Sequence, residues 1–308
     1  MAPGGARLYA VTDGITGSGF VRAFHLGGGG KLTELSQQSL EGRMACHLVV
    51  DPEEQLVITA SYGDGSISVF PTTPDGKIAA QTDAKKFEGA GPNPSRQTQP
   101  HAHFATTDPA GKFAYICDLG ADKIWIFRID PGNGTLTPAD PAFAATPAGG
   151  GVRHMTFLRH APFAYANNEM GLSVTAFSHN PETGALTTIQ TLSTVPEGVT
   201  PGNWTTAAII AHPSEKWLYV SSRGDDTISV FAIQPGGKLL RIEIAPAGVE
   251  GPRAIQVDPT GQWLLAAGQR DNRVVVQKID PATGRLTLTD HSIEIGAPVC
   301  IVFAPAAE

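Results

Sequence analysis

A repeated pair of apolar runs, joined by an Asp-Pro or His-Pro turn, constrains the possible fold of this chain more than any other sequence feature. The pair occurs in residues 46–60, 101–116, 152–166, 207–220 and 252–265. Arg159 stands in place of the turn proline in the third copy, and residues 298–305 match the first apolar run alone. Copies follow one another at intervals of roughly 50 residues, a period that is typical of β-propeller blades made of short strands.

Turn residues divide each repeat into four predicted strands, with alternating apolar and β-branched or aromatic positions. Residues 7–40 match strands two to four of a repeat, whereas residues 298–305 match strand one. We therefore expect the two segments to form one composite blade, because a closed ring removes both free sheet edges. The sequence predicts an all-β, six-bladed propeller that forms a single domain over residues 1–308.

Composition and charge narrow the possible functions. The 308 residues include 35 glycines and 24 prolines, and the net charge is −7. This charge, with no basic stripe, argues against a nucleic-acid partner. No apolar run reaches the length of a membrane span, and no basic and apolar leader opens the chain. The three cysteines have no metal-like spacing, so we expect reduced thiols and a cytoplasmic protein. The oligomeric state is not readable from these features.

Two connections are longer than turns. Residues 83–100 and 193–206 are polar and rich in glycine and proline. Long connections of this kind serve as binding loops or lids in compact folds, and they also occur as simple surface insertions. Both interpretations apply to this chain.

Polar residues interrupt the apolar pattern at two aligned positions. We define position −6 and position +10 relative to the turn proline, or to Arg159 where it replaces the proline. Position −6 holds Cys46, His103, Arg153, Ala207 and Arg253, and position +10 holds Tyr62, Leu119, Glu169, Arg223 and Gln269. Because strands one and two are antiparallel, the start of one and the end of the other meet at the same edge. We expect His103, Arg153, Glu169, Arg223, Arg253 and Gln269 to surround one mouth of the propeller.

Three arginines and a glutamate among apolar strands need either partners or a ligand, because burying an unpaired charge is costly. One interpretation is an internal network of ion pairs that fills the channel. The other is a site for an anion, since a guanidinium binds a carboxylate or phosphate with two hydrogen bonds. His101 lies two residues before His103 on the same strand face, which makes it a candidate second contact.

The same residues resemble those of the propeller-type lactonase family. The resemblance lies in PHAH (100–103), GVRHMTF (151–157), YANNE (165–169), LYVSSRG (218–224), GPRAIQVDP (251–259) and AAGQ (266–269). The family includes bacterial 6-phosphogluconolactonases of the propeller type and the fungal carboxy-cis,cis-muconate cyclase, and its members have seven blades. The six blades counted here leave open a true six-bladed variant or a sequence that lacks an N-terminal unit.

The resemblance implies a catalytic set of one histidine, two arginines and one glutamate, which by motif are His103, Arg153, Glu169 and Arg223. It also implies substrate binding by Arg253 and Gln269, to which we add His101 and Asn168 as candidates. The expected activity is hydrolysis of an anionic sugar or acid lactone without a cofactor. His103 would act as the base, Glu169 as its partner, and the arginines as the anion clamp.

Three other functions fit parts of the pattern. A cycloisomerase acting on a carboxylated muconate would use the same clamp and proton carrier. A metal-dependent lactonase needs several oxygen ligands around a hard cation, yet this rim offers Glu169, Asn168 and three repelling arginines. A non-catalytic interaction scaffold would use the charges to fill the channel. Alanine in place of Arg153 distinguishes the enzyme from the scaffold. If the protein is an enzyme, the variant folds but loses turnover; if it is a scaffold, the variant fails to fold.

Overall fold

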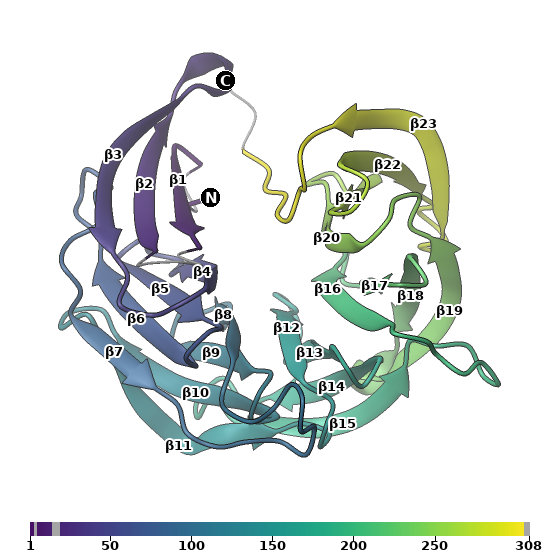
Figure 1. Ribbon diagram of the computed structural model, residues 1–308, viewed down its shortest axis with the longest axis horizontal. Coiled ribbons are helices and arrows are strands. Elements are labelled where there is room, and N and C mark those ends of the chain that lie inside the picture. The colour runs from purple at the N-terminus through teal and green to yellow at the C-terminus, as the bar shows by residue number, and fades with distance from the viewer. Residues whose placement is uncertain (3–4, 14–18, 305–308) are drawn as a thin grey trace. The chain divides into compact units, whose positions relative to one another are not determined.

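The computed structural model describes residues 1–2, 5–13 and 19–304, and its regular structure is almost entirely β. The described chain contains six antiparallel sheets, and Figure 1 shows the strands of each sheet side by side in chain order. The chain divides into two compact units, which are described separately. Residues 1–151, 180–185 and 304 belong to the first unit, and residues 152–179 and 186–303 to the second.

The first unit holds one sheet of three strands and two sheets of four. These strands are β1 (Arg7–Thr12), β2 (Phe20–Leu26) and β3 (Leu32–Ser39), then β4 (Ala45–Val50), β5 (Leu56–Ser61), β6 (Ser66–Pro71) and β7 (Asp83–Lys86), then β8 (Ala102–Thr107), β9 (Phe113–Asp118), β10 (Lys123–Asp130) and β11 (Thr135–Ala145). Each sheet has the up-and-down order of a propeller blade.

The second unit holds three four-stranded sheets. These strands are β12 (Val152–Phe157), β13 (Phe163–Asn168), β14 (Ser173–His179) and β15 (Leu186–Ser193), then β16 (Thr205–Ala211), β17 (Trp217–Arg223), β18 (Thr227–Ile233) and β19 (Leu239–Pro246), then β20 (Pro252–Val257), β21 (Trp263–Gly268), β22 (Arg273–Ile279) and β23 (Leu286–Glu294). Short 3₁₀ turns occur at Gly28–Gly30 and Pro235–Gly237. The predicted all-β fold with six propeller blades is thus confirmed.

Residues 298–303 belong to the second unit and β1 to β3 to the first, so their pairing in one composite blade stays a prediction. The sheet of β1, β2 and β3 has three strands, and residues 295–304 contain no strand. Residue 305, the last of the predicted segment, lies outside the described residues. An apolar pattern shows that a segment can be a strand, but pairing also requires a partner edge in register. The prediction of one domain over residues 1–308 stays a prediction.

The Asp-Pro turns take their shape from the aspartate side chain. The carboxylate of Asp108 accepts a hydrogen bond of 2.7 Å from the backbone N–H of Phe113, which closes the turn. The copy at 152–166 has Leu158 where the others have a polar residue. There the carboxylate of Glu215 accepts the N–H of Arg159 instead. The turn is therefore retained even where the Asp-Pro pair is absent.

Buried tyrosines connect successive sheets within each unit. In the second unit the hydroxyl of Tyr165 donates to the carbonyl of Gly237 at 3.1 Å, and Tyr219 donates to Gly284 at 2.9 Å. Each tyrosine lies on strand two of one sheet, and each glycine lies in the turn before strand four of the next. Tyr9 on β1 makes the same kind of bond. Its place identifies β1 as a second strand, as the sequence pattern predicts for residues 7–40.

The long connections differ from their predicted form. Residues 83–86 form β7, which pairs with β6, so the segment 83–100 begins with a strand rather than a loop. The rest of this segment is held by Gln97, which is fully buried and donates 2.7 Å to the carboxylate of Asp122. In the second unit residues 196–203 are exposed. The described part of the chain has no helix that is long and apolar enough to cross a membrane.

Candidate active site

A β-bulge places the side chain at position −6 in each complete sheet. The ladder of β12 passes from Val152 directly to His154, which leaves Arg153 as the extra residue. The same shift skips Cys46 in β4, His103 in β8 and Arg253 in β20. In β16 the shift lies between Thr206 and Ile209. A bulge redirects its side chain away from the regular alternation and is common beside active sites.

Position +10 lies at the same end of each sheet as position −6. Val152 at the start of β12 is paired with Asn168, the residue before Glu169. In the next sheet Thr205 is paired with Arg223 at the end of β17. The predicted antiparallel arrangement of the two aligned positions is therefore confirmed inside each sheet.

Glu169 joins two arginines in the second unit. Its Oε2 atom lies 2.9 Å from Nε of Arg153 and 3.1 Å from Nη2 of Arg223. The exposed fractions of the side chains are 2% for Arg153, 6% for Glu169 and 15% for Arg223. One carboxylate of Glu169 thus pairs with two guanidinium groups. Part of the ion-pair network that the channel-filling interpretation requires is therefore present.

The backbone and side chain of Thr206 hold the cluster in place. Its N–H donates to the carbonyl of Glu169 at 3.0 Å, and its carbonyl accepts 3.2 Å from Nη2 of Arg223. Its hydroxyl accepts 2.8 Å from the amide of Asn167. The Nη1 atom of Arg153 lies 3.0 Å from Nε2 of His154. Because a guanidinium only donates, the imidazole must accept at Nε2 and carry its proton on Nδ1.

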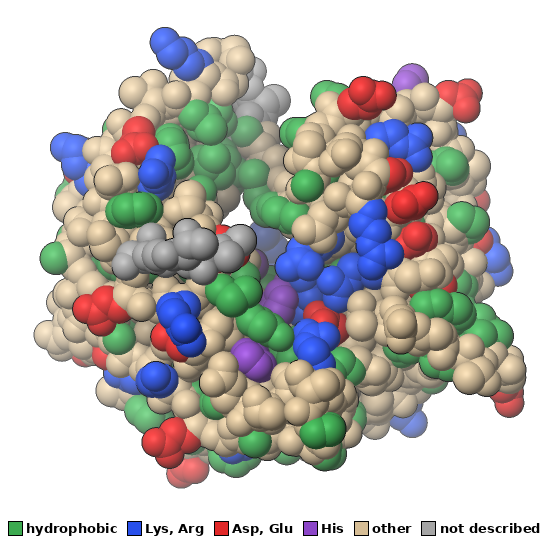
Figure 2. Space-filling model, in the orientation of Figure 1, with side chains coloured by type: hydrophobic (Ala, Val, Ile, Leu, Met, Phe, Trp, Pro, Cys, Tyr) green, Lys and Arg blue, Asp and Glu red, His purple; other side chains and the backbone are tan. Residues whose placement is uncertain are grey.

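Arg253 and Gln269 lie at the same end of the sheet formed by β20 to β23. The backbone N–H of Gln269 donates 3.1 Å to the carbonyl of Gly251, two residues before Arg253. Both side chains are partly exposed, and within the described residues neither makes a hydrogen bond or an ion pair. Figure 2 shows Lys and Arg side chains gathered over the strands β16 and β20 of the second unit. This end of the second unit therefore offers cationic groups to solvent.

Asn168 is fully buried at the end of β13. Its amide nitrogen donates 2.9 Å to Ser173 and 3.0 Å to Thr175, both on β14. The donor hydrogens of this side chain therefore support the hairpin that carries Glu169.

The first unit contains the histidines of the PHAH segment. The ring of His103 is edge-on to Tyr62, at 5.7 Å between centroids, and the residue is 6% exposed. The ring of His101 is stacked on Tyr62 at 4.2 Å and is partly exposed. Arg96 donates 3.2 Å to the hydroxyl of Tyr62, and Cys46 donates to the carbonyl of His103 at 3.3 Å. Tyr62 thus orders both histidines.

The candidate residues therefore form one set in each unit. His101 and His103 are together in the first unit, and Arg153, Glu169 and Arg223 are together in the second. The expectation that both sets surround one mouth stays a prediction.

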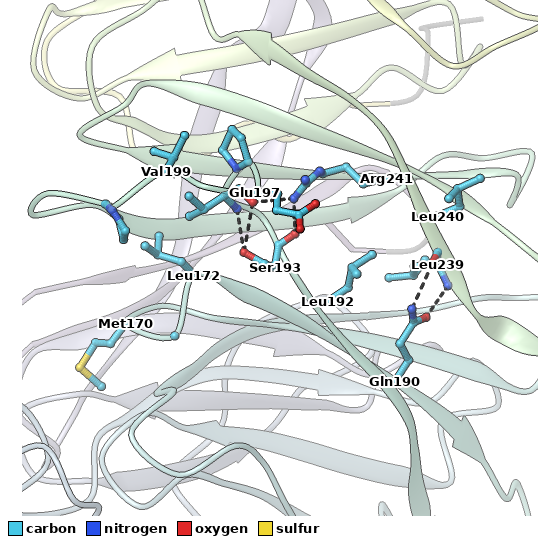
Figure 3. A pocket seen from close by; sticks show the side chains of 14 residues that line it. Met170, Leu172, Gln190, Leu192, Ser193, Glu197, Val199, Leu239, Leu240 and Arg241 are labelled. Carbon is cyan, nitrogen blue, oxygen red and sulfur yellow. Dashed lines mark hydrogen bonds between the residues drawn. The ribbon is translucent and has the colours of Figure 1, made fainter.

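The second unit also contains an apolar cavity of about 700 Å³, lined by none of the candidate residues. Figure 3 shows Leu172, Leu192 and Leu239 among its walls, with Met170, the residue after Glu169, at one side. The guanidinium of Arg241 donates 2.7 Å to the carbonyl of Ser193 and 2.8 Å to that of Val195. These bonds hold the start of the 193–206 connection over the cavity. None of the candidate residues lines this cavity, so we place the candidate site at the arginine cluster.

No group of three or more His, Cys, Asp or Glu side chains in the described part of the chain is placed to hold a metal ion. Cys117 is fully buried, and burial raises the pKa of its thiol, which disfavours a thiolate nucleophile at this position.

The structure adds three residues to the site that the sequence pattern does not mark as functional. His154 follows Arg153, and its role depends on the bulge, which no residue type marks. Thr206 acts mainly through backbone atoms that every residue carries. Tyr62 occupies position +10, so the repeat alignment already contained it.

Comparisons with known proteins give a consistent result. Residues 1–303 match the family model described as "Lactonase, 7-bladed beta-propeller". A 6-phosphogluconolactonase of Bacillus subtilis is 33% identical over 96% of this chain and 83% of its own length. A 6-phosphogluconolactonase of Pectobacterium carotovorum is 30% identical over 93% of this chain and 81% of its own. The structure of a periplasmic gluconolactonase of Pseudomonas aeruginosa superposes with a TM-score of 0.91 at 28% identity, over 97% of this chain and 86% of that one.

Proposed function

This chain belongs to the seven-bladed β-propeller lactonase family, and on that premise we propose that it hydrolyses a small anionic lactone of the 6-phosphogluconolactone type without a metal ion. As a member of this family the chain is a lactonase-type enzyme. The relatives described above are named for a phosphorylated or for an unphosphorylated gluconolactone. The anionic substrate and the metal-independent mechanism are our own inferences.

The partly exposed guanidinium of Arg253 in the second unit is the observation that carries this proposal. Arg153 and Arg223 both pair with Glu169, whereas Arg253 makes no ion pair within the described residues. A substrate that brings a phosphate or carboxylate would supply the missing counter-charge. A neutral lactone would leave Arg253 without one.

Each residue of the predicted catalytic set has a role in this proposal. Water attacks the lactone carbonyl carbon, and a proton-accepting histidine of the 100–103 segment, which the motif assigns as His103, removes its proton. Arg223, the more exposed arginine of the cluster, stabilises the negative charge on the carbonyl oxygen. Glu169 fixes the direction of both guanidinium groups. The ring C–O bond then breaks, and the leaving alkoxide takes a proton to give the open hydroxy acid.

Arg253 is proposed to bind the anionic group at a distance from the carbonyl, with Gln269 beside it as a neutral donor. Its location on a bulge, with a partly exposed side chain, suits contact with a ligand better than internal packing. The Arg253→Gln exchange keeps a donor and removes the charge. A charged hydrogen bond is worth about 1.5 to 3 kcal/mol, so KM for an anionic lactone should rise roughly 10- to 150-fold.

A hydrolysis assay tests the proposal. Purified protein is given a phosphorylated, a carboxylated and a neutral lactone, with and without a chelator, beside the Arg253→Gln, His103→Ala and Glu169→Ala proteins. We expect turnover of the anionic lactones, no effect of the chelator, and a defect of the Arg253→Gln protein that is confined to anionic substrates. Equal rates on neutral and anionic lactones would contradict the anion site. A folded protein that opens no lactone but cyclises a carboxylated muconate would assign the cycloisomerase reaction instead.

A further inference from the structure

The two histidines of the PHAH segment differ in exposure, because His103 is buried and His101 is partly exposed. We propose that His101, through Nε2, is the group that takes the proton from the attacking water. This inference rests on the proposed lactone hydrolysis. It changes the role of His101 from a substrate contact to a catalytic base.

The tautomer of His101 follows from its hydrogen bond. Its Nδ1 atom lies 2.7 Å from the backbone carbonyl oxygen of Tyr62. A carbonyl oxygen only accepts, so Nδ1 must carry the proton, and in the neutral ring Nε2 then carries the lone pair. The ring plane is fixed too, because it lies at 13° to the ring of Tyr62 at 4.2 Å. The backbone N–H of His101 donates 2.8 Å to the buried carboxylate of Asp118.

In three other histidines, the basic ring nitrogen accepts a hydrogen bond from a donor within the protein. Nδ1 of His47 accepts the N–H of Ala105 at 3.3 Å. Nδ1 of His212 accepts the N–H of Ser214 at 3.0 Å. Nε2 of His154 accepts from Arg153. Their basic nitrogens are therefore already hydrogen-bonded.

His101 is the exception among these four rings. In the described part of the chain no hydrogen bond reaches its Nε2 atom, and the ring is partly exposed, so water can approach it. His103 is buried, with 6% of its surface exposed, and is less accessible to water. A base must lie within hydrogen-bond reach of the water whose proton it takes. The geometry therefore favours His101 over the residue that the motif assigns.

The proton balance of the step is complete with one water molecule. The water oxygen forms a bond to the lactone carbonyl carbon while one of its protons passes to Nε2 of His101. The resulting imidazolium keeps its Nδ1–H bond to the Tyr62 carbonyl, whose dipole stabilises the positive charge. When the ring C–O bond breaks, the same proton passes to the leaving oxygen and His101 returns to its neutral form.

Asparagine in place of His101 separates the chemical role from the structural one. The amide nitrogen of Asn can donate to the Tyr62 carbonyl as Nδ1 does, yet Asn has no basic nitrogen. For His101→Asn we expect kcat to fall roughly 10²- to 10⁴-fold, which is the usual range for a lost general base, with little change in KM. The acidic limb of the pH–rate profile should disappear with it. Added imidazole should restore turnover to His101→Ala.

The matched control is His47→Asn, the same exchange at a histidine of the same unit that lies outside the proposed machinery. We expect its kcat to stay near that of the unaltered protein, without an effect of imidazole. A His101→Asn protein whose kcat stays within threefold would overturn the inference. So would a defect expressed in KM alone, which would make His101 a substrate contact.

A measurement that needs no turnover distinguishes failure of this inference from failure of the proposed function. Nitrogen-15 NMR of the histidine rings at a pH above their titration should show His101 protonated on Nδ1. Protonation on Nε2 would overturn the inference even in an active enzyme. A protein that opens no lactone would refute the proposed function and, with it, the catalytic role of His101, whatever the NMR result.

Discussion

Replacing Glu169 by Gln tests whether the buried charges are as strongly coupled as the structure indicates. The exchange keeps the shape of the side chain and removes the negative charge between Arg153 and Arg223. At an effective dielectric constant near 20, each contact of about 3 Å corresponds to roughly 5 kcal/mol of attraction before the cost of desolvation. Arg153 is 2% exposed, so solvent cannot replace its lost partner.

The expected loss of stability is about 3 to 5 kcal/mol, the range found when one partner of a buried ion pair is removed. For a chain of this length that corresponds to a fall in Tm of roughly 5 to 8 °C. Calorimetry and urea unfolding of the variant measure both quantities. Glu197→Gln is the matched control, because Glu197 is exposed in the same unit.

The ion pair between Glu169 and Arg153 predicts that substitutions of these two residues are energetically coupled. Met in place of Arg153 should cost less stability in the Glu169→Gln protein than in the unaltered one, because no ion pair with Arg153 is then left to lose. The Glu197→Gln control should melt within 1 °C of the unaltered protein. If Glu169→Gln does so too, the charges of Glu169 and its two arginines are screened from one another. The assignment of a buried, strongly coupled cluster is then refuted.

Two further predictions concern the turns and the buried tyrosines. Gly236 and Gly237 both have a positive φ. A Cβ atom added at Gly237 would lie 2.4 Å from the ring of Phe163, whereas a Cβ atom added at Gly236 would have no other atom within 4 Å. Gly237→Ala should therefore lower stability by about 1 to 3 kcal/mol more than Gly236→Ala, as measured by urea unfolding. Burial raises the pKa of Tyr165 and Tyr219 above the ordinary value of 10.0, so the neutral form is favoured in the folded state. Their contribution to stability is complete below pH 10 and falls as the pH rises further; a free energy of unfolding that is flat up to pH 12 would contradict this.

Much of the site could be predicted because the repeat itself aligns it. Arg153, Glu169 and Arg223 occupy only two positions of the repeat, and the register of each sheet confirms that those positions meet at one end. Two charges of opposite sign at aligned positions of a single sheet predict a contact without any knowledge of packing.

Other features lie beyond such an alignment. The tautomer of His101 depends on a backbone carbonyl of Tyr62, and backbone atoms leave no mark in a sequence. β7 consists of the residues DAKK, which have little strand propensity, and forms because β6 offers an unpaired edge. Residues 298–304 are the converse case, because this segment forms no strand in the structure. Its pattern suits a strand, but strand propensity does not specify a partner.

The bulge at position −6 has a consequence for how such a protein can acquire new chemistry. The extra residue of each bulge makes no ladder pair, so its side chain can change while the paired residues on either side stay in register. In this chain the five bulges already carry a thiol, an imidazole, guanidinium groups and, at Ala207 and Ala208, only methyl groups. The bulge position of each complete sheet can therefore carry different functional groups on the same backbone framework. A library of variants confined to these positions would explore new reactivity while leaving the framework that folds the protein unaltered.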